Sequence, residues 1–233
     1  MNRLSCLLAS AALAFPGAAV PQSRVMTQGS SRMEIMLERM DGAAWRTIDP
    51  GLVLNQGDRV RFRFRTNFDG YLYVMNQSTS GKYEQLFPRE ETGTDNVLKG
   101  GQEYYVPATK TVFRIAGPAG YETVYWMVTP AKLTDAAPEY KPLPPPPSPR
   151  PLPSSLIPRC DDALLKARGD CIDSSAGPKL VPRGAGIPPN MQSAAKPQNP
   201  RDLVFLRQKD TAVISSPAPL TGPVIYEFRL AHR

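Results

Sequence analysis

Apolar and polar residues alternate strictly at the start of the segment Gly57–Pro88. Every second residue from Arg59 to Arg65 is an arginine, and the residues between them are valine or phenylalanine. A period of two puts the arginines on one face of a strand and the apolar side chains on the other. Two turn signals divide the rest of the segment into two more strands, in the order Asp69-Gly70, Tyr71–Asn76, Ser80-Gly81 and Lys82–Phe87. We therefore predict a three-stranded antiparallel meander with one dry face.

Short alternating segments recur along the rest of the chain and predict further strands. These segments are Met33–Met40, Tyr104–Val106, Val112–Ala116, Glu122–Thr129, Leu203–Arg207, Ala212–Ser215 and Val224–Leu230. Regular short strands with Gly and Pro turns favour an all-β fold, an antiparallel β-sandwich, over an α/β fold. We expect a sandwich domain over residues 28–135. Because three strands alone are marginal, we expect the C-terminal strands of residues 201–233 to dock on it.

Residues 136–200 hold more than half of the 26 prolines and predict a largely irregular insertion with one short helix. Lys141–Pro153 has the composition of a stiff polyproline II spacer, and its PxxP patterns offer the alternative of binding to aromatic grooves. The expected helix follows residue 160. Asp161 and Asp162 favour its N-terminus, Lys166 and Arg168 its C-terminus, and Gly169 can cap it.

Residues 1–19 resemble a secretory signal peptide. Arg3 precedes an apolar run over Leu4–Phe15, and Gly17-Ala18-Ala19 offers small residues for a signal peptidase. The alternative is a buried N-terminal helix. We expect cleavage after Ala19 and a periplasmic or extracellular protein with no transmembrane segment in the mature chain.

The mature chain would keep two cysteines, Cys160 and Cys171. In an oxidising compartment such a pair forms a disulfide, and the alternative is two free thiols in a flexible segment. The spacing, with no histidine nearby, is a poor zinc site. We therefore predict a disulfide and no metal.

The formal net charge is +7, and most of the basic excess lies after residue 135. This excess could attract an anionic surface, or it could serve solubility alone. Export and the lack of a clustered basic motif argue against nucleic acid as a partner.

Three motifs in this chain resemble family 4384 of the bacterial domain-of-unknown-function series. They are the Gly57-Asp58-Arg59-Val60 start, the Asp69-Gly70-Tyr71-Leu72-Tyr73-Val74 centre and the Gln85-Leu86-Phe87-Pro88 end. The resemblance covers roughly residues 48–130. It implies an exported β-sandwich domain and carries no established active site.

Few residues offer catalytic chemistry. His232 is the single histidine and lies next to the chain end, so a histidine-based nucleophile system would depend on a frayed terminus. Glu90, Glu91 and Asp95 fall in one expected loop and are interpreted as solvated charges. The alternatives are a calcium site and the acids of a cell-wall or polysaccharide hydrolase. We predict no catalytic residue and no cofactor.

The proposed contact surface consists of Arg61, Arg63, Arg65, Tyr71 and Tyr73. The arginines could form an anion-binding face, or a solvated face balanced by cross-strand acids. The tyrosines could stack on sugars or hold a peptide, or they could pack under loops or the C-terminal strands. We expect a non-enzymatic binding or assembly module, with an envelope protein or an anionic cell-wall polymer as partner. The alternatives are a hydrolase and a regulatory or sensor domain that acts on an exported partner.

Overall fold

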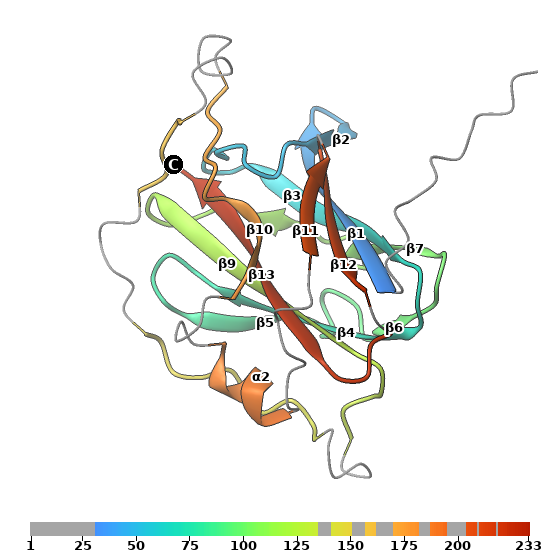
Figure 1. The fold of residues 1–233 in the computed structure, drawn as a ribbon. Coiled ribbons are helices and arrows are strands. Elements are labelled where there is room, and N and C mark those ends of the chain that lie inside the picture. The colour runs from blue at the N-terminus through green and yellow to red at the C-terminus, as the bar shows by residue number, and fades with distance from the viewer. Residues whose placement is uncertain are drawn as a thin grey trace, which may run out of the picture.

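The computed structural model describes residues 31–134, 141–150, 157–161, 170–181, 187–194, 204–208, 210–217 and 219–233. These residues form two antiparallel β-sheets that pack face to face, and one short helix, α2 (Pro189–Ala194), lies outside them (Figure 1). The predicted all-β sandwich is therefore confirmed. None of the helices in the described ranges is long and apolar enough to cross a membrane.

Each sheet has five strands in its main order and further short strands beside them. The first sheet has the order β11-β12-β1-β3-β7, with β2 beside β1 and β8 beside β3. Its strands are β1 (Ser31–Asp41), β2 (Ala44–Ile48), β3 (Arg59–Thr66), β7 (Glu103–Val106), β8 (Phe113–Arg114), β11 (Val204–Gln208) and β12 (Thr211–Ser216). The second sheet has the order β10-β13-β9-β4-β5, with β6 beside β4. Its strands are β4 (Gly70–Gln77), β5 (Tyr83–Phe87), β6 (Val97–Leu98), β9 (Gly120–Thr129), β10 (Gly177–Leu180) and β13 (Val224–His232).

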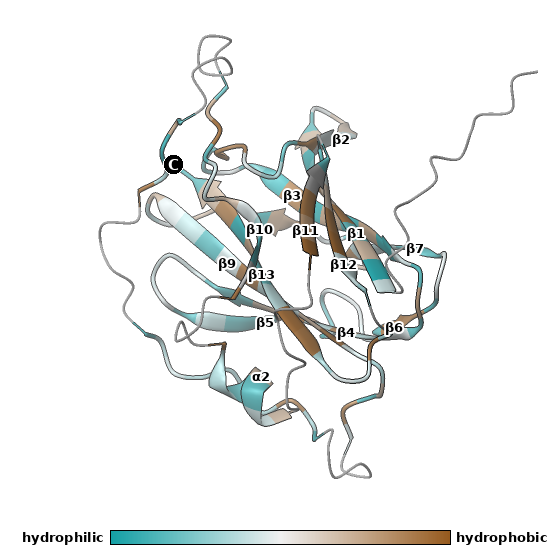
Figure 2. Ribbon diagram, in the orientation of Figure 1, coloured by the Kyte–Doolittle hydropathy of each residue, from teal (hydrophilic) through white to brown (hydrophobic). Residues whose placement is uncertain are grey.

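The core lies between the two sheets and is built around aromatic side chains. Phe62 of β3 meets the rings of Trp126 and Phe228 edge-on, with 5.2 Å between centroids in both pairs. Trp126 and Phe228 belong to β9 and β13, which pair along nine residues of each strand, from Val224↔Val128 to His232↔Gly120. Edge-to-face contacts of this kind add to the burial energy of aromatic residues. Figure 2 shows apolar stretches along β13 and along strands of the first sheet such as β11.

The predicted three-stranded meander is wrong. Strand β3 pairs with β1 and β7 of the first sheet, whereas β4 pairs with β9 and β5 of the second. The physical reason is that both strands have an apolar face, and these faces bury each other across the sandwich instead of lying side by side in one sheet. Asn67 supports the crossing because its side chain accepts a hydrogen bond from the Arg32 amide at 2.6 Å. The predicted β4–β5 hairpin is present.

The strands from the C-terminal part of the chain are integral to both sheets. Strand β12 pairs with β1, and β13 lies between β9 and β10. Strands β2, β6 and β10 were not predicted from the sequence. The helix expected after Cys160 lies outside the described residues except for Asp161, and α2 was not predicted.

The described part of the proline-rich segment is not a free spacer. Lys141 donates its amide to the Ala194 carbonyl at 2.9 Å, and Arg150 donates its amide to the Gly81 carbonyl at 3.0 Å. Between these points the Pro144 carbonyl accepts a hydrogen bond from Asn190. The segment and α2 lie over the outer face of the second sheet, where they bury a second apolar cluster. It includes Tyr73, Met75, Tyr125, Met127, Leu133 and Met191.

The predicted disulfide is present between Cys160 and Cys171, whose Cα atoms are 4.8 Å apart. Cys171 packs with Val53, Tyr121 and Ala231 in a third small apolar cluster. The disulfide closes a loop within the proline-rich region, and Cys171 holds that loop against the sandwich through this cluster and through a hydrogen bond from the Val53 amide to its carbonyl.

Candidate functional site

The arginine row, defined as Arg61, Arg63 and Arg65, lies on the outer face of the first sheet. The carboxylate of Glu38, on the neighbouring strand β1, accepts hydrogen bonds from the Nε atoms of both Arg61 and Arg63 at 2.7 Å. The Glu38 side chain is only 7% exposed, so these ion pairs hold a nearly buried acid.

The other members of the row have equally specific partners. Arg63 also reaches Glu103 of β7 at 3.1 Å, and Arg65 contacts Glu34 of β1 at 2.5 Å. Burial alone would lower the pKa of Arg63, but the hydrogen bond that it donates to Glu103 and the charge of Glu38 outweigh burial and raise the pKa. Each arginine of the row is therefore paired with an acid of its own sheet, although Glu34 is shared with Arg32, and most of the charge of the row is not available to an anionic partner.

Two aromatic rings enclose the first arginine of the row. The guanidinium carbon of Arg61 lies 4.3 Å from the ring centroid of Trp45 and 4.4 Å from that of Tyr105. A guanidinium at such distances is attracted by the faces of the rings. This stacking holds the guanidinium between the two rings, so Arg61 has a structural role that the sequence alone did not predict.

Tyr71 and Tyr73 lie on the outer face of the other sheet. Their neighbours Leu72 and Val74 belong to the core between the sheets, so the tyrosines point away from it. Tyr73 is buried beneath the proline-rich cover, and its hydroxyl accepts a hydrogen bond from the Leu133 amide at 3.0 Å. The structure does not bring the arginines and the tyrosines together, so the five predicted residues do not form one contact surface. The expected packing of the tyrosines under other segments is what the structure shows.

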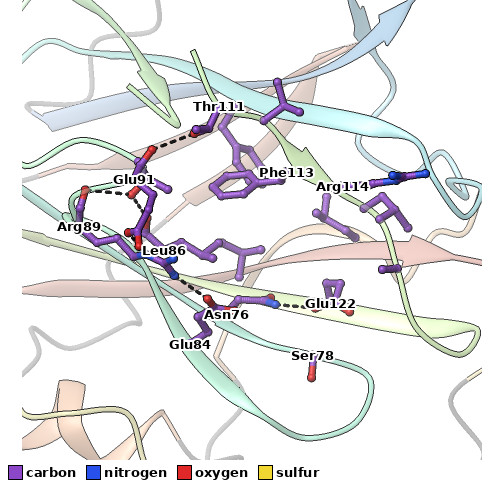
Figure 3. Close-up of a pocket in the computed structure, with 17 residues that line it drawn as sticks. Asn76, Ser78, Glu84, Leu86, Arg89, Glu91, Thr111, Phe113, Arg114 and Glu122 are labelled. Atoms are coloured by element: carbon purple, nitrogen blue, oxygen red, sulfur yellow. Dashed lines mark hydrogen bonds and ion pairs between the residues drawn. The ribbon is translucent and has the colours of Figure 1, made fainter. Parts of the chain in front are cut away.

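A cavity of about 410 Å³ lies between the two sheets and is the strongest candidate site (Figure 3). Phe62, Phe113 and Arg114 line it from the first sheet. Strands β4, β5, β9 and β13 line it from the second sheet with Asn76, Glu84, Leu86, Glu122, Val124 and Leu230. The volume is in the range of small-ligand sites, and the mixture of apolar and polar walls is typical of them.

The polar wall of this cavity comes from core-facing positions of the second sheet. Asn76 follows Leu72 and Val74 on the inner face of β4, and Glu122 precedes Val124 and Trp126 on that of β9. Asn76 Nδ2 donates to Glu122 Oε2 at 2.5 Å. Asn76 Oδ1 is buried and has no hydrogen-bond partner among the described residues.

His232 stands next to this pair, because it is the last inward-facing residue of β13. It is fully buried, and its Nε2 lies 3.6 Å from Glu122 Oε1, beyond hydrogen-bonding distance. The expectation of a frayed terminus is therefore wrong. The chain end is held because Arg233 donates its amide to the Leu54 carbonyl and accepts a bond from the Gln56 amide.

A second charged group, centred on Arg89, also lines the cavity. Arg89 contacts Glu84 at 2.5 Å and Glu91 at 2.7 Å. The hydrogen bonds to these acids, first Glu91 and then Glu84, raise the pKa of Arg89, and the same bond lowers the pKa of Glu91. The guanidinium is therefore already shared by two carboxylates.

The loop carboxylates proposed from the sequence do not converge on one point. Glu91 lines the cavity, but Asp95 accepts a hydrogen bond from the Val97 amide at 3.1 Å, and Glu90 is exposed and does not line the cavity. In the described ranges no group of His, Cys, Asp and Glu side chains is placed to hold a metal ion. Asn76 and Glu122 were missed, although both are polar residues at core-facing positions of predicted strands, which is the signal that could have found them.

These features define a β-sandwich protein with a cavity of mixed polarity between its sheets. Residues 53–132 match the family model described as a domain of unknown function (DUF4384). The match confirms the resemblance seen in the sequence, and it spans β3 to β9, which supply most of the cavity wall. A search of the curated proteins and a search of the solved structures found no match.

Proposed function

We propose that this protein is an exported, non-enzymatic binding module of the bacterial envelope, and that it binds its partner through the cavity between the sheets. The observation that carries the proposal is the cavity itself. Its volume of about 410 Å³ is bounded by apolar side chains such as Phe62, Phe113 and Leu230 and by a similar number of polar and charged side chains. Binding sites combine apolar walls with oriented polar groups, and this cavity has both, with a larger polar share than most.

The carboxylates of the cavity favour binding over hydrolysis. Glu84 and Glu91 share the guanidinium of Arg89, and Glu122 is hydrogen-bonded to Asn76. A glycosidase needs one carboxyl group that stays protonated as the acid, whereas the hydrogen bond from Arg89 lowers the pKa of Glu91. The arginine row is a weaker candidate for the contact, because Glu34, Glu38 and Glu103 already neutralise it. An envelope protein is therefore favoured over an anionic wall polymer as the partner.

The test is a capture experiment with the full mature chain on envelope extract and on isolated wall polymer. Ala116 lines the cavity and is exposed, so Ala116→Trp should fill the cavity without disturbing the core. Ala44→Trp is the matched control, because Ala44 is also exposed but lies on β2 of the first sheet.

We expect wild type and Ala44→Trp to capture the same envelope protein and Ala116→Trp to lose it. Equal capture by all three proteins would overturn the role of the cavity. Release of soluble fragments from wall polymer by wild type, abolished by Glu122→Gln, would replace binding by hydrolysis. Export is tested separately, since N-terminal sequencing of protein from the envelope fraction should begin at Val20.

A further inference from the structure

The inner face of the second sheet changes from apolar to polar where it reaches the cavity. Strand β4 places Asn76 after two apolar core residues, and β9 places Glu122 before three of them, Val124, Trp126 and Val128. Figure 3 shows the two polar side chains joined to each other along the cavity wall. A polar pair at core positions costs stability unless it is satisfied or used.

Both members of this pair present acceptors. Glu122 can only accept, so the Asn76 atom that bonds to it is the amide nitrogen, and the Asn76 oxygen remains as a second acceptor. That oxygen is buried and has no partner among the described residues. A ligand that completes this wall must therefore bring hydrogen-bond donors.

The charge of Glu122 is also unmatched. In the part of the chain that the structure describes, no lysine or arginine forms an ion pair with it. Its Oε1 accepts a hydrogen bond from the Thr79 amide at 3.4 Å and lies 3.6 Å from His232 Nε2, a contact that is an ion pair only when the imidazole is protonated. Arg89 is occupied by Glu84 and Glu91. Arg114 directs its guanidinium away from Glu122 in Figure 3, toward the turn at Gly57. A ligand with positive charge would therefore meet an acid that no lysine or arginine of the described residues neutralises.

The remaining walls suit a flexible apolar stem. Phe62, Leu86, Phe113, Val124 and Leu230 come from both sheets and enclose the space beside the polar pair. A lysine or arginine side chain has this composition, with a chain of methylene groups that packs on apolar surface and a charged head that takes several acceptors.

We propose that the cavity binds an alkylammonium or alkylguanidinium group, with the cationic head at Glu122 and Asn76 and the stem against the apolar wall. This inference rests on the proposed function, because it assumes that the cavity is the binding site. The same chemistry is found in a lysine or arginine side chain of a protein partner and in a free diamine.

The experiment is calorimetric titration of the full mature chain with four defined probes. They are Nα-acetyl-lysine methylamide, Nα-acetyl-arginine methylamide, 1,5-diaminopentane, and the lysine probe acetylated on its ε-nitrogen. The last probe keeps the stem and loses the charge. We expect the cationic probes to bind about tenfold or more tightly than the acetylated one, because a partly buried carboxylate discriminates strongly between charged and neutral partners.

Two variants locate the contact. Glu122→Gln keeps the side-chain size and removes the charge, and we expect it to lower the affinity for the cations about tenfold or more. Glu103→Gln is the control, because Glu103 also belongs to an ion pair but lies on the outer face of the first sheet, and we expect no change. If Glu122→Gln fails to fold, the comparison of the two lysine probes on wild type decides alone.

The outcomes separate the inference from the proposed function. Equal binding of charged and acetylated lysine probes, lost in Ala116→Trp, would overturn the cation while leaving the cavity as the binding site. If none of the cationic probes binds, the proposal of a cationic ligand is also overturned, even where Ala116→Trp abolishes envelope capture. If Ala116→Trp changes neither probe binding nor capture, the cavity itself is refuted. Tighter binding of the capped amino acids than of the diamine would assign the cation to a protein side chain, and the reverse order would assign it to a free diamine.

Discussion

Replacing Gly81 by alanine should release the proline-rich segment from the second sheet. Gly81 has φ +80°, and a Cβ atom there would lie 1.8 Å from the Arg150 carbonyl oxygen. No side chain can make such a contact, so the segment would have to move away. Gly101 provides the matched control, because its φ is +83° and a Cβ atom there meets nothing within 4 Å.

The two substitutions share one cost and differ in another. An alanine in the left-handed region costs about 1–2 kcal/mol at either position. Gly81→Ala should lose in addition the Arg150–Gly81 hydrogen bond, about 1 kcal/mol, and part of the burial of Leu143, about 1 kcal/mol. We therefore expect the free energy of unfolding to fall by about 3–4 kcal/mol for Gly81→Ala and by about 1–2 kcal/mol for Gly101→Ala.

Urea unfolding gives these free energies, and hydrogen exchange locates the change. The Arg150 amide should exchange faster in Gly81→Ala than in wild type and should stay protected in Gly101→Ala. Equal losses of stability in the two variants, with equal exchange at Arg150, would refute the reasoning, because the segment would then not be held at this turn.

Three further variants test other parts of the structure. Replacing Cys160 and Cys171 by serine should lower the free energy of unfolding by about 3 kcal/mol in the chain-entropy model, measured by urea unfolding, and reduction of wild type should have the same effect. Burial raises the pKa of Glu227 against the opposing charge of Arg229, so the folded state holds this proton more tightly than the unfolded chain does. The contribution of Glu227 to stability should be fully present below the ordinary glutamate pKa and should be lost as pH rises through the raised value. Glu227→Gln should remove this contribution from melting curves taken across that range. Changing the whole arginine row to methionine should lower the free energy of unfolding by about 3–5 kcal/mol, because Glu38 is left nearly buried and unpaired. If the variant unfolds at the same urea concentration as wild type, the acids are solvated and the reasoning is wrong.

The alternation of side chains predicted most strands, because one dry face per strand is a local property of the sequence. Val224–Leu230 is an example, since its apolar residues at every second position point into the core as expected. Alternation does not specify which sheet a strand joins, and this is why the meander from β3 to β5 was wrong. Two consecutive strands with apolar faces can pair in one sheet or face each other across a core, and the choice depends on the other strands that each can pair with.

The outer face of the second sheet shows a different limit of sequence reasoning. Tyr73, Met75, Tyr125 and Met127 fill the outward positions of two neighbouring central strands, which makes that face nearly as apolar as the inner one. A sheet with two apolar faces must be covered on both. The proline-rich segment provides the cover, but its composition is also that of an exposed spacer, so composition alone could not distinguish the two roles.

The candidate site lies where the alternation that predicts the fold is broken. Asn76 and Glu122 occupy core-facing positions of strands that are otherwise apolar on that side, and the two positions are adjacent in space because β4 and β9 pair in register. One polar residue at such a position could be an accident of packing, but two that bond to each other across neighbouring strands keep a polar surface inside the sandwich. Both residues can be found in the sequence, but only the pairing of β4 with β9 shows that they form one polar wall of the cavity. A strand's exceptions to its own pattern therefore carry the functional information, and they become interpretable once the sheet order is known.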